Sequence, residues 1–215
     1  MKEVYFLRHG WVGSFLELDP DRRQLTKIFL PGDFPGLPSI ALERTAATLL
    51  ALTDVTLDVI PLDRLARFFE RAPRFLFTLL VVTQQERVML MDQLAMVGQS
   101  KALQRIAALI VHVLRRLSLL RPGTGNVIEW PISQQRVAEA AGLTSVHVNR
   151  IFRELTDLRL IERKGRQLKL LDPEALSKLS GLPERPFVNE PAWLVKCCES
   201  ATAKAAIGHM VRRAG

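Results

Sequence analysis

The sequence predicts an α+β protein with an N-terminal β-roll, a long central helix and a C-terminal winged helix-turn-helix. Three patterns lead to this prediction. Residues 3–60 alternate apolar with polar or small side chains and are punctuated by turn residues. From Pro73 the apolar residues recur at threes and fours instead. Residues 133–169 then read as two short helices joined by a tight turn at Gly142 and followed by a small basic hairpin.

The N-terminal segment has the pattern of about six short strands, which favours a roll or barrel. Asp19, Pro20 and Asp21 form a hairpin turn between two of them, whereas the stretch from Pro31 to Pro38 contains too many Pro and Gly residues for regular structure. The segments with strand character are residues 4–7, 11–18, 24–30, 45–52 and 55–60.

Helical periodicity begins where the strands end at Pro61. Residues 62–70 can form a short helix, and Pro73 opens a longer one that runs to about Val97. Its stripe reads Leu76, Leu80, Thr83, Arg87, Leu90, Leu94 and Val97. A helix of this length between two domains is most simply a dimer seam, and the alternative is that the stripe packs on its own β domain. Gly98 is expected to break the helix as a hinge.

A further helix is predicted over residues 101–119, as the floor on which the helix-turn-helix packs. The residues from Arg121 to Gly125 read as a loop, and residues 127–131 as a short strand. The first helix of the motif then carries a stripe of Val137, Ala138 and Ala141, and Gly142 permits a left-handed turn at its end. Thr144 or Ser145 can cap the second helix, whose predicted core stripe is Val148, Ile151, Phe152, Leu155 and Leu158.

The other face of this second helix carries the chemistry. Rotation by about 100° per residue turns five side chains towards solvent: Ser145, Val146, Asn149, Arg150 and Arg153. In a DNA major groove Arg can pair with guanine, Asn with adenine and Val with a thymine methyl group. The hairpin turns at Lys164 and Gly165, and its tip can meet phosphates through Arg163, Lys164 and Arg166. The alternative is a packing unit whose charged residues only solvate a surface.

The distribution of charge favours DNA. The chain has 215 residues and a net charge of +8, enough length for two modest domains. Residues 98–181 hold 14 Lys and Arg against 7 Asp and Glu, whereas residues 1–97 hold 11 against 12. The basic excess therefore lies with the helix-turn-helix, which indicates a polyanionic partner for that half.

Other classes of protein lack support in the sequence. No apolar run is long enough to span a membrane, and the N-terminus has no secretory signal, so we expect a cytoplasmic protein. The two cysteines, Cys197 and Cys198, are adjacent and cannot alone hold zinc or an iron–sulfur cluster. The four histidines show no spacing with a nucleophile or metal ligand, so neither a catalytic residue nor a metal site is expected.

The order of elements resembles that of the Crp-Fnr superfamily of bacterial transcription regulators, the cyclic-AMP receptor protein and its relatives. Three motifs carry the resemblance, which covers residues 4 to about 180: GWVGSFLELDPDRRQLTKIFLPGDFPG at 10–36, ERTAATLLALTDVTLDVIP at 43–61, and ISQQRVAEAAGLTSVHVNRIFRELTDLRLIERKGRQL at 132–168.

The resemblance implies four parts in the chain. These are a cyclic-nucleotide-binding-like β-roll at 1–72, which we expect to lack the family's first strands, a dimerisation helix and hinge at 73–98, a winged helix-turn-helix at 99–181, and an extension without a recognised counterpart at 182–215.

For the DNA site, the resemblance implies that Ser133 and Gln135 contact the DNA backbone. The start of the second helix would read bases, and Arg150 matches the family's Arg at that position. The cyclic-AMP receptor protein has Arg and Glu in place of Ser145 and Val146, so its half-site preference does not transfer. The full predicted DNA-binding set is Ser133, Gln135, Thr144, Ser145, Val146, His147, Asn149, Arg150, Arg153, Lys164 and Arg166.

For the ligand site, the family has a Gly-Glu pair that binds the ribose and an Arg-Ser/Thr pair that binds the cyclic phosphate. Arg44 and Thr45 match the second pair, but Gly36 and Leu37 stand where the first should be. Without the carboxylate we expect no cyclic-nucleotide cofactor, although Gly36, Arg44 and Thr45 remain the candidate ligand residues. The cysteines of the family's oxygen-sensing branch are absent from the matching region.

Together these patterns predict a sequence-specific regulator that binds a near-palindromic DNA operator as a homodimer through residues 73–97, with RNA polymerase as a further partner if it is an activator. The alternative is a small-molecule sensor or interaction module of the same fold that no longer binds DNA.

Overall fold

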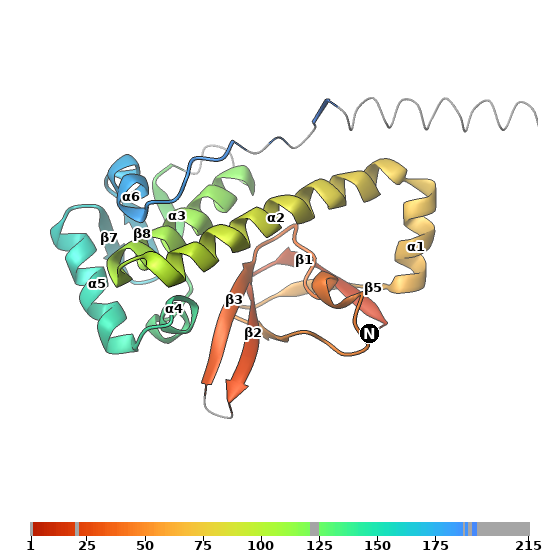
Figure 1. Cartoon of the computed structure of the whole chain (residues 1–215), viewed down its shortest axis with the longest axis horizontal. Helices are drawn as coiled ribbons and strands as arrows, with labels where there is room; N and C mark the ends of the chain where they lie inside the picture. Colours follow the sequence, from red (N-terminus) through yellow and green to blue (C-terminus); the bar gives the residue numbers. More distant parts are fainter. Residues whose placement is uncertain (1, 20–21, 121–124, 187, 189–190, 193–215) are drawn as a thin grey trace, which may run out of the picture. The chain divides into compact units, whose positions relative to one another are not determined.

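The computed structural model describes residues 2–19, 22–120, 125–186, 188 and 191–192 (Figure 1). The chain divides into two compact units. The first contains Met1–Leu62 and Leu94–Pro183, and the second contains Asp63–Gln93 and Glu184–Gly215. The predicted β-roll and the predicted helix-turn-helix therefore fall in one unit, and most of the long helix falls in the other.

The roll consists of two antiparallel sheets. β1 (Glu3–His9) pairs with β5 (Thr56–Pro61), and β2 (Val12–Asp19) lies between β3 (Arg22–Phe29) and β4 (Thr48–Ala51). The strand-like segments are confirmed, but the described part of the roll holds five strands rather than about six. The Pro- and Gly-rich connection after β3 forms only turns and a short 3-10 helix, η1 (Leu37–Ser39). Of the predicted hairpin turn, residues 20–21 lie outside the described residues.

Gly10 allows the chain to turn sharply from β1 into β2. Its φ is +85°, and a β-carbon at this position would lie 2.1 Å from the carbonyl oxygen of Asp54. Next to it, the Trp11 amide donates to Thr53 Oγ1 at 2.9 Å. The start of β2 is thereby held against the loop between β4 and β5, and only glycine fits at the joint.

The second unit is built on helices α1 (Leu62–Arg71) and α2 (Pro73–Gln99). Phe75, at the start of α2, packs edge-on to Phe68 at 5.0 Å between ring centroids. At the other end of the unit, Arg185 donates from two nitrogens to the carboxylate of Asp92, at 2.9 and 3.0 Å. These hydrogen bonds, with the negative charge of Asp92, raise the pKa of the Arg185 guanidinium.

The long helix α2 exposes one apolar face. Leu76, Leu80, Leu90, Leu94 and Val97 are all classed as exposed. Leu76 and Leu94 lie nine residues, or about two and a half turns, from Gln85, so they are on the opposite side of the helix. Gln85 itself donates to the carbonyl oxygen of Val188 at 3.4 Å. The exposed face of α2 therefore includes the predicted stripe, and Val82 and Met91 beside it are exposed as well.

The predicted break at Gly98 is wrong, because α2 continues to Gln99 and the break falls at Ser100 and Lys101. A single Gly costs a helix only about 1 kcal/mol relative to Ala, too little to end one of this length. The next helix, α3 (Ala102–Leu120), begins where the side chain of Gln104 accepts the Lys101 amide at 3.0 Å. Side-chain capping, rather than glycine, sets the boundary.

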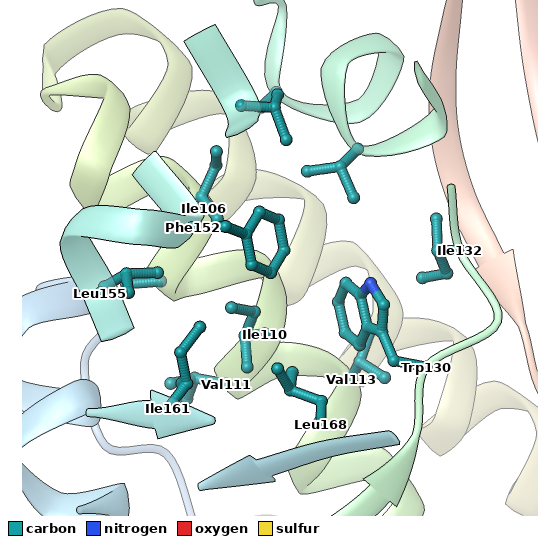
Figure 2. Close-up of a cluster of buried hydrophobic side chains, with 14 of the residues drawn as sticks. Ile106, Ile110, Val111, Val113, Trp130, Ile132, Phe152, Leu155, Ile161 and Leu168 are labelled. Carbon is teal, nitrogen blue, oxygen red and sulfur yellow. The ribbon is translucent and has the colours of Figure 1, made fainter. Parts of the chain in front are cut away.

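The C-terminal part of the first unit is a winged helix-turn-helix. After α3 come β6 (Val127–Glu129), α4 (Gln134–Ala141), α5 (Ser145–Asp157), β7 (Ile161–Lys164), β8 (Gln167–Leu170) and α6 (Pro173–Ser180), with sheet order β6-β8-β7. Figure 2 shows the core, in which α3 supplies Ile106, Ile110 and Val113 beneath Phe152 and Trp130. The prediction that α3 is the floor of the motif is confirmed.

Two details of this part differ from prediction. The predicted core stripe of α5 includes Leu158, but this residue is 53% exposed because the helix ends at Asp157 and the 3.6-residue period ends with it. The turn of the wing is formed by Gly165 and Arg166, whereas Lys164 is the last residue of β7 and pairs with Gln167. Residues 121–124 of the predicted loop lie outside the described residues.

A nearly buried ion pair joins α3 to the roll. Arg116 donates to the Asp33 carboxylate at 2.5 Å and to the carbonyl oxygen of Ile28 at 2.8 Å. Asp33 also accepts the Leu30 amide at 2.7 Å. The side chains of Arg116 and Asp33 are only 18% and 13% exposed. The positive charge on α3 and the negative charge on the roll therefore neutralise each other inside the first unit.

None of the described helices is long and apolar enough to cross a membrane.

Replacing Asp33 with Ala should lower the free energy of unfolding by about 3 kcal/mol, because the Arg116 charge would stay buried without its partner. Urea denaturation followed by circular dichroism measures the change. Asp58→Ala is the matched control, since Asp58 pairs with Arg8 at 2.6 Å in a site where both side chains are largely exposed. That pair should contribute less than about 1 kcal/mol. Equal losses in the two variants would contradict the role given to the buried pair.

Candidate nucleic-acid interface

Helix α4 is capped at both ends, by Ser133 at its start and by the predicted Gly142 at its end. The hydroxyl of Ser133 accepts the Arg136 amide at 3.3 Å. At the other end Gly142 adopts φ +63°, and the Leu143 amide donates to the carbonyl oxygen of Ala138 at 3.0 Å. The predicted left-handed turn is confirmed, and it directs the chain into α5.

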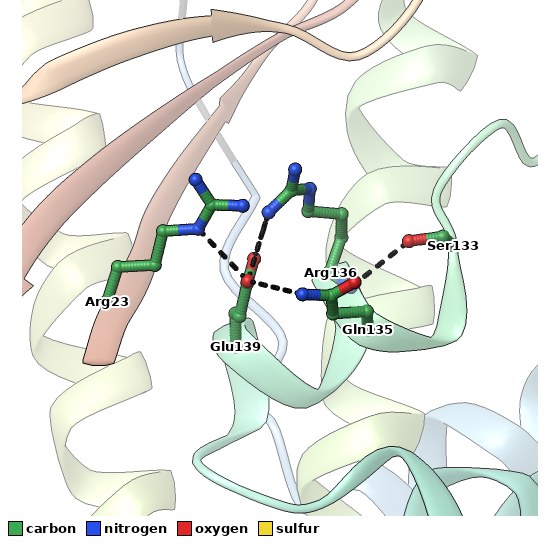
Figure 3. Close-up of polar contacts among 5 residues, drawn as sticks. All are labelled: Arg23, Ser133, Gln135, Arg136 and Glu139. Atoms are coloured by element: carbon green, nitrogen blue, oxygen red, sulfur yellow. Dashed lines mark hydrogen bonds and ion pairs between the residues drawn. The ribbon is translucent and has the colours of Figure 1, made fainter. Parts of the chain in front are cut away.

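Polar contacts from the roll hold α4 in place, as Figure 3 shows. The carboxylate of Glu139 accepts from Arg23 of β3 at 3.0 Å and from Arg136 at 2.7 Å, and Gln135 lies 3.5 Å from it. Beside them, Gln24 of β3 donates to the carbonyl oxygen of Ala140 at 3.0 Å. Ser133 and Gln135 nevertheless stay exposed at the start of the helix.

Arg23, Arg136 and Glu139 were not among the predicted site residues. Arg23 and Glu139 are separated by 116 positions, so no local pattern links them. Arg136 and Glu139 are three residues apart on one helix, a spacing that does indicate an ion pair. This spacing could have predicted the ion pair between Arg136 and Glu139. It could not have predicted the contact of Glu139 with Arg23 of the roll.

Helix α5 has one buried and one exposed face. Val148, Ile151, Phe152 and Leu155 are buried, which leaves Ser145, Val146, Arg150 and Arg153 exposed, with Asn149 half-buried between the two faces. Val146 is 82% exposed, the highest fraction among the large hydrophobic side chains of the described residues. An apolar side chain so placed adds nothing to the core, so the fold itself does not require it.

Two residues at the start of α5 are tied to their neighbours. Thr144 is the N-cap, and its hydroxyl accepts the His147 amide at 3.3 Å. Nε2 of the His147 ring lies 3.0 Å from a terminal nitrogen of Arg150. Because an arginine can only donate, Nε2 is the acceptor in this bond and the ring proton is on Nδ1.

The tip of the wing carries two of its basic residues. Lys164 and Arg166 are exposed at the tip of the β7–β8 hairpin. Arg163 lies with its guanidinium carbon 5.4 Å from the centre of the Phe152 ring. It therefore packs on the base of α5 by a cation–π contact, which leaves Lys164 and Arg166 as the residues best placed for phosphates.

The predicted ligand residues lie in the roll. A pocket of about 310 Å³ is lined by Gly36 and Thr45, together with Tyr5, Ser14, Phe29, Pro38, Ser39, Ala46, Ala47, Thr48 and Leu49. Arg44 is exposed and is not a lining residue. The lining contains hydroxyl and apolar groups, and no carboxylate or guanidinium is among its residues.

No group of three or more His, Cys, Asp or Glu side chains that could hold a metal ion occurs among the described residues. Cys197 and Cys198 lie outside them.

The arrangement of α4, α5 and the β7–β8 hairpin on α3 is that of a winged helix-turn-helix DNA-binding protein. Two family models match the chain, a cyclic nucleotide-binding domain at residues 1–72 and a Crp-like helix-turn-helix domain at residues 104–179. The chain belongs to the Crp-Fnr family of DNA-binding transcription regulators, and the resemblance found in the sequence is confirmed.

Relatives of known function match most of the chain. The nitrogen fixation regulation protein FixK of Rhizobium meliloti is 30% identical over 178 residues, which cover 82% of this chain and 78% of the relative. The transcriptional activatory protein AadR of Rhodopseudomonas palustris is 28% identical over 177 residues, 82% of this chain and 73% of the relative.

Solved structures show the same fold. FixK2 from Bradyrhizobium japonicum has a TM-score of 0.69 at 22% identity, with 86% of this chain and 89% of that chain covered. A CooA mutant from Carboxydothermus hydrogenoformans has a TM-score of 0.66 at 20% identity, with 83% and 79% covered.

Gly142→Ala should lower the free energy of unfolding by about 1–2 kcal/mol, because a residue with a β-carbon is strained in the left-handed region. The nearest atom to that β-carbon is Nη1 of Arg105 at 3.9 Å, so no clash adds to the cost. Gly142→Asn is the matched control and should lose less, since Asn tolerates this conformation better. Chemical denaturation compares the two, and an Asn variant as unstable as the Ala variant would count against the explanation.

Proposed function

We propose that the chain binds a near-palindromic operator as a homodimer and reads it with the first half of α5. The observation that carries the proposal is the division of this helix. Its apolar stripe is fully used in the core, and Ser145, Val146 and Arg150 are left exposed in its first two turns. Recognition helices enter the major groove with their N-terminal residues against base edges.

The roles of the individual residues follow from their chemistry. Arg150 donates to a guanine, Asn149 pairs with an adenine, and Val146 packs on a thymine methyl group. Phosphates are bound on both sides of the groove, and these contacts fix the position of the protein without reading sequence. The residues in the phosphate set are Ser133, Gln135, Thr144, Arg153, Lys164 and Arg166, whereas Ser145 faces the bases at the start of the helix.

The exposed stripe of α2 supports the homodimer. Five large apolar side chains on one face of a helix of 27 residues are costly to leave in water, and a second copy of the same face can cover them. A two-fold dimer would place its two copies of α5 in major grooves about one helical turn apart. A near-palindrome is the operator that such symmetry requires.

The roll pocket supports DNA binding without a cyclic nucleotide. Its lining offers neither a carboxylate for a ribose nor a guanidinium for a cyclic phosphate. If the protein is an activator, as several of its relatives are, RNA polymerase is its further partner, in the cytoplasm where bacterial DNA lies.

Selection of bound duplexes from a random pool tests the proposal. The purified full chain is used at about 0.15 M salt, with and without added cyclic AMP. We expect the same near-palindrome to be enriched in both arms. No enrichment in either arm would favour a sensor or interaction module that does not bind DNA. Enrichment only with cyclic AMP would contradict the claim that DNA binding needs no cyclic nucleotide and would leave the rest of the proposal intact.

Arg150→Ala should weaken binding to the selected operator by about 1–3 kcal/mol and relax one base position in each half-site. Removing the guanidinium removes two hydrogen bonds to guanine and leaves the phosphate contacts in place. Fluorescence anisotropy on the operator and on single-base variants measures both effects. Arg64→Ala, an equal change of charge at an exposed residue of α1, should leave affinity and preference as they are. An unaltered base preference in the Arg150 variant would show that Arg150 does not read a base.

Leu90→Asp should convert the dimer into a monomer, because each subunit would bury a carboxylate in the seam. Analytical ultracentrifugation measures the mass, and the monomer should also lose affinity for the full operator. Leu42→Asp is the control, since Leu42 is 47% exposed against 51% for Leu90 but lies in the loop after η1. A Leu90 variant that still sediments as a dimer would place the seam elsewhere.

A further inference from the structure

His147 occupies the third position of α5, one turn before Arg150. Its amide is already satisfied by the hydroxyl of Thr144, so the cap does not need its side chain. At this position a Glu or Gln often reaches back to the N-cap. Here Nε2 of the ring instead lies 3.0 Å from a terminal nitrogen of Arg150. The imidazole is therefore an acceptor for the side chain that is expected to read guanine.

The direction of this bond matters for the groove. Long side chains on a helix lean towards its N-terminus, and a hydrogen bond to a residue three positions earlier holds Arg150 there. That end of α5 also carries Val146, the most exposed large apolar side chain described. The carboxylate of Glu154, four residues after Arg150, is the other possible partner at helical spacing and would draw the guanidinium towards the opposite end of the helix.

The bond does not compete with base pairing. A guanidinium has five N–H groups in a planar fork, and the contact with His147 uses one of them. Four donors remain, which is enough for the two hydrogen bonds to O6 and N7 of guanine. A free arginine side chain samples many rotamers. An acceptor that keeps it over the first turn of the helix therefore reduces the side-chain entropy that is lost when DNA binds.

We propose that His147 is a positioning residue that sets Arg150 for guanine and so determines specificity through it. The inference rests on the role of Arg150 in the proposed function. It separates His147 from the residues expected to touch DNA directly. Its imidazole acts in the free protein, before the groove is entered, and its effect on DNA passes through the guanidinium.

A double-mutant cycle tests this inference. The discrimination is the ratio of affinities for the selected operator and for a duplex in which the guanine assigned to Arg150 is replaced. It is measured for the wild type, His147→Ala, Arg150→Ala and the double variant. His147→Ala should reduce the discrimination about three- to tenfold, the range of one net hydrogen bond, while affinity for unrelated DNA stays the same. In the Arg150→Ala background the same change should have no further effect.

His147→Gln is the conservative variant. The side-chain oxygen of Gln can take the place of Nε2 as an acceptor, so most of the discrimination should return. Equal thermal stability of the Ala and Gln variants would show that a folding defect does not cause the difference between them.

Each other outcome overturns a specific statement. If His147→Ala weakens binding equally with and without Arg150, the ring contacts DNA itself and the positioning role is wrong. If His147→Ala leaves the discrimination unchanged while Arg150→Ala abolishes it, only the inference on His147 fails. If Arg150→Ala leaves it unchanged, the assignment of the reading residue fails first, and the positioning role fails with it.

Discussion

One apolar core, shared by the roll and the helix-turn-helix, is the constraint on which the first unit depends. The cluster runs from Phe15 and Leu25 of the β2–β3 hairpin, through Ile106 and Ile110 of α3, to Ile151 of α5. Burial of apolar surface contributes about 25 cal/mol per Å², so a continuous cluster of this size outweighs the single polar contacts around it. Because the core takes the whole apolar stripe of α5, the opposite face of that helix is left for solvent or DNA.

A hydrophobic core fixes what is inside but is not directional, and polar contacts supply the register. Arg116 binds Asp33 and a strand carbonyl, and Glu139 binds Arg23 across the same boundary. Each contact needs a particular pair of atoms within hydrogen-bond distance, so a small slide of α4 on β3 would leave charges unpaired. Gln24 adds a further contact of this kind, because its side-chain amide donates to the carbonyl oxygen of Ala140 near the end of α4.

The features that could be predicted from the sequence are those that depend on residues close together in the chain. The helix pair, its turn at Gly142 and the buried stripe of α5 follow from periodicity and from one residue that tolerates positive φ. The errors have equally local causes. Leu158 continues the apolar spacing of α5 past the point where the helix ends, and Gly98 is too weak a helix breaker to end α2. The contact between Arg23 and Glu139 could not be predicted, because it depends on how two distant segments pack. The DNA-binding and ligand-binding residues named from the sequence stay predictions.

The exposed face of α5 has consequences for which bases it can read. A side chain with hydrogen-bonding groups at the second position of the helix can distinguish bases by donors and acceptors, whereas Val146 can only respond to shape and to a methyl group. On the proposed reading surface, discrimination by hydrogen bonds is then expected mainly from the next turn, from Asn149 and Arg150. Asn149 is half-buried, which limits its movement, but Arg150 is exposed and has more rotamers to lose. If Arg150 reads a base as proposed, the precision of recognition depends on what restricts its side chain, and His147 is the side chain that lies within hydrogen-bond distance of it.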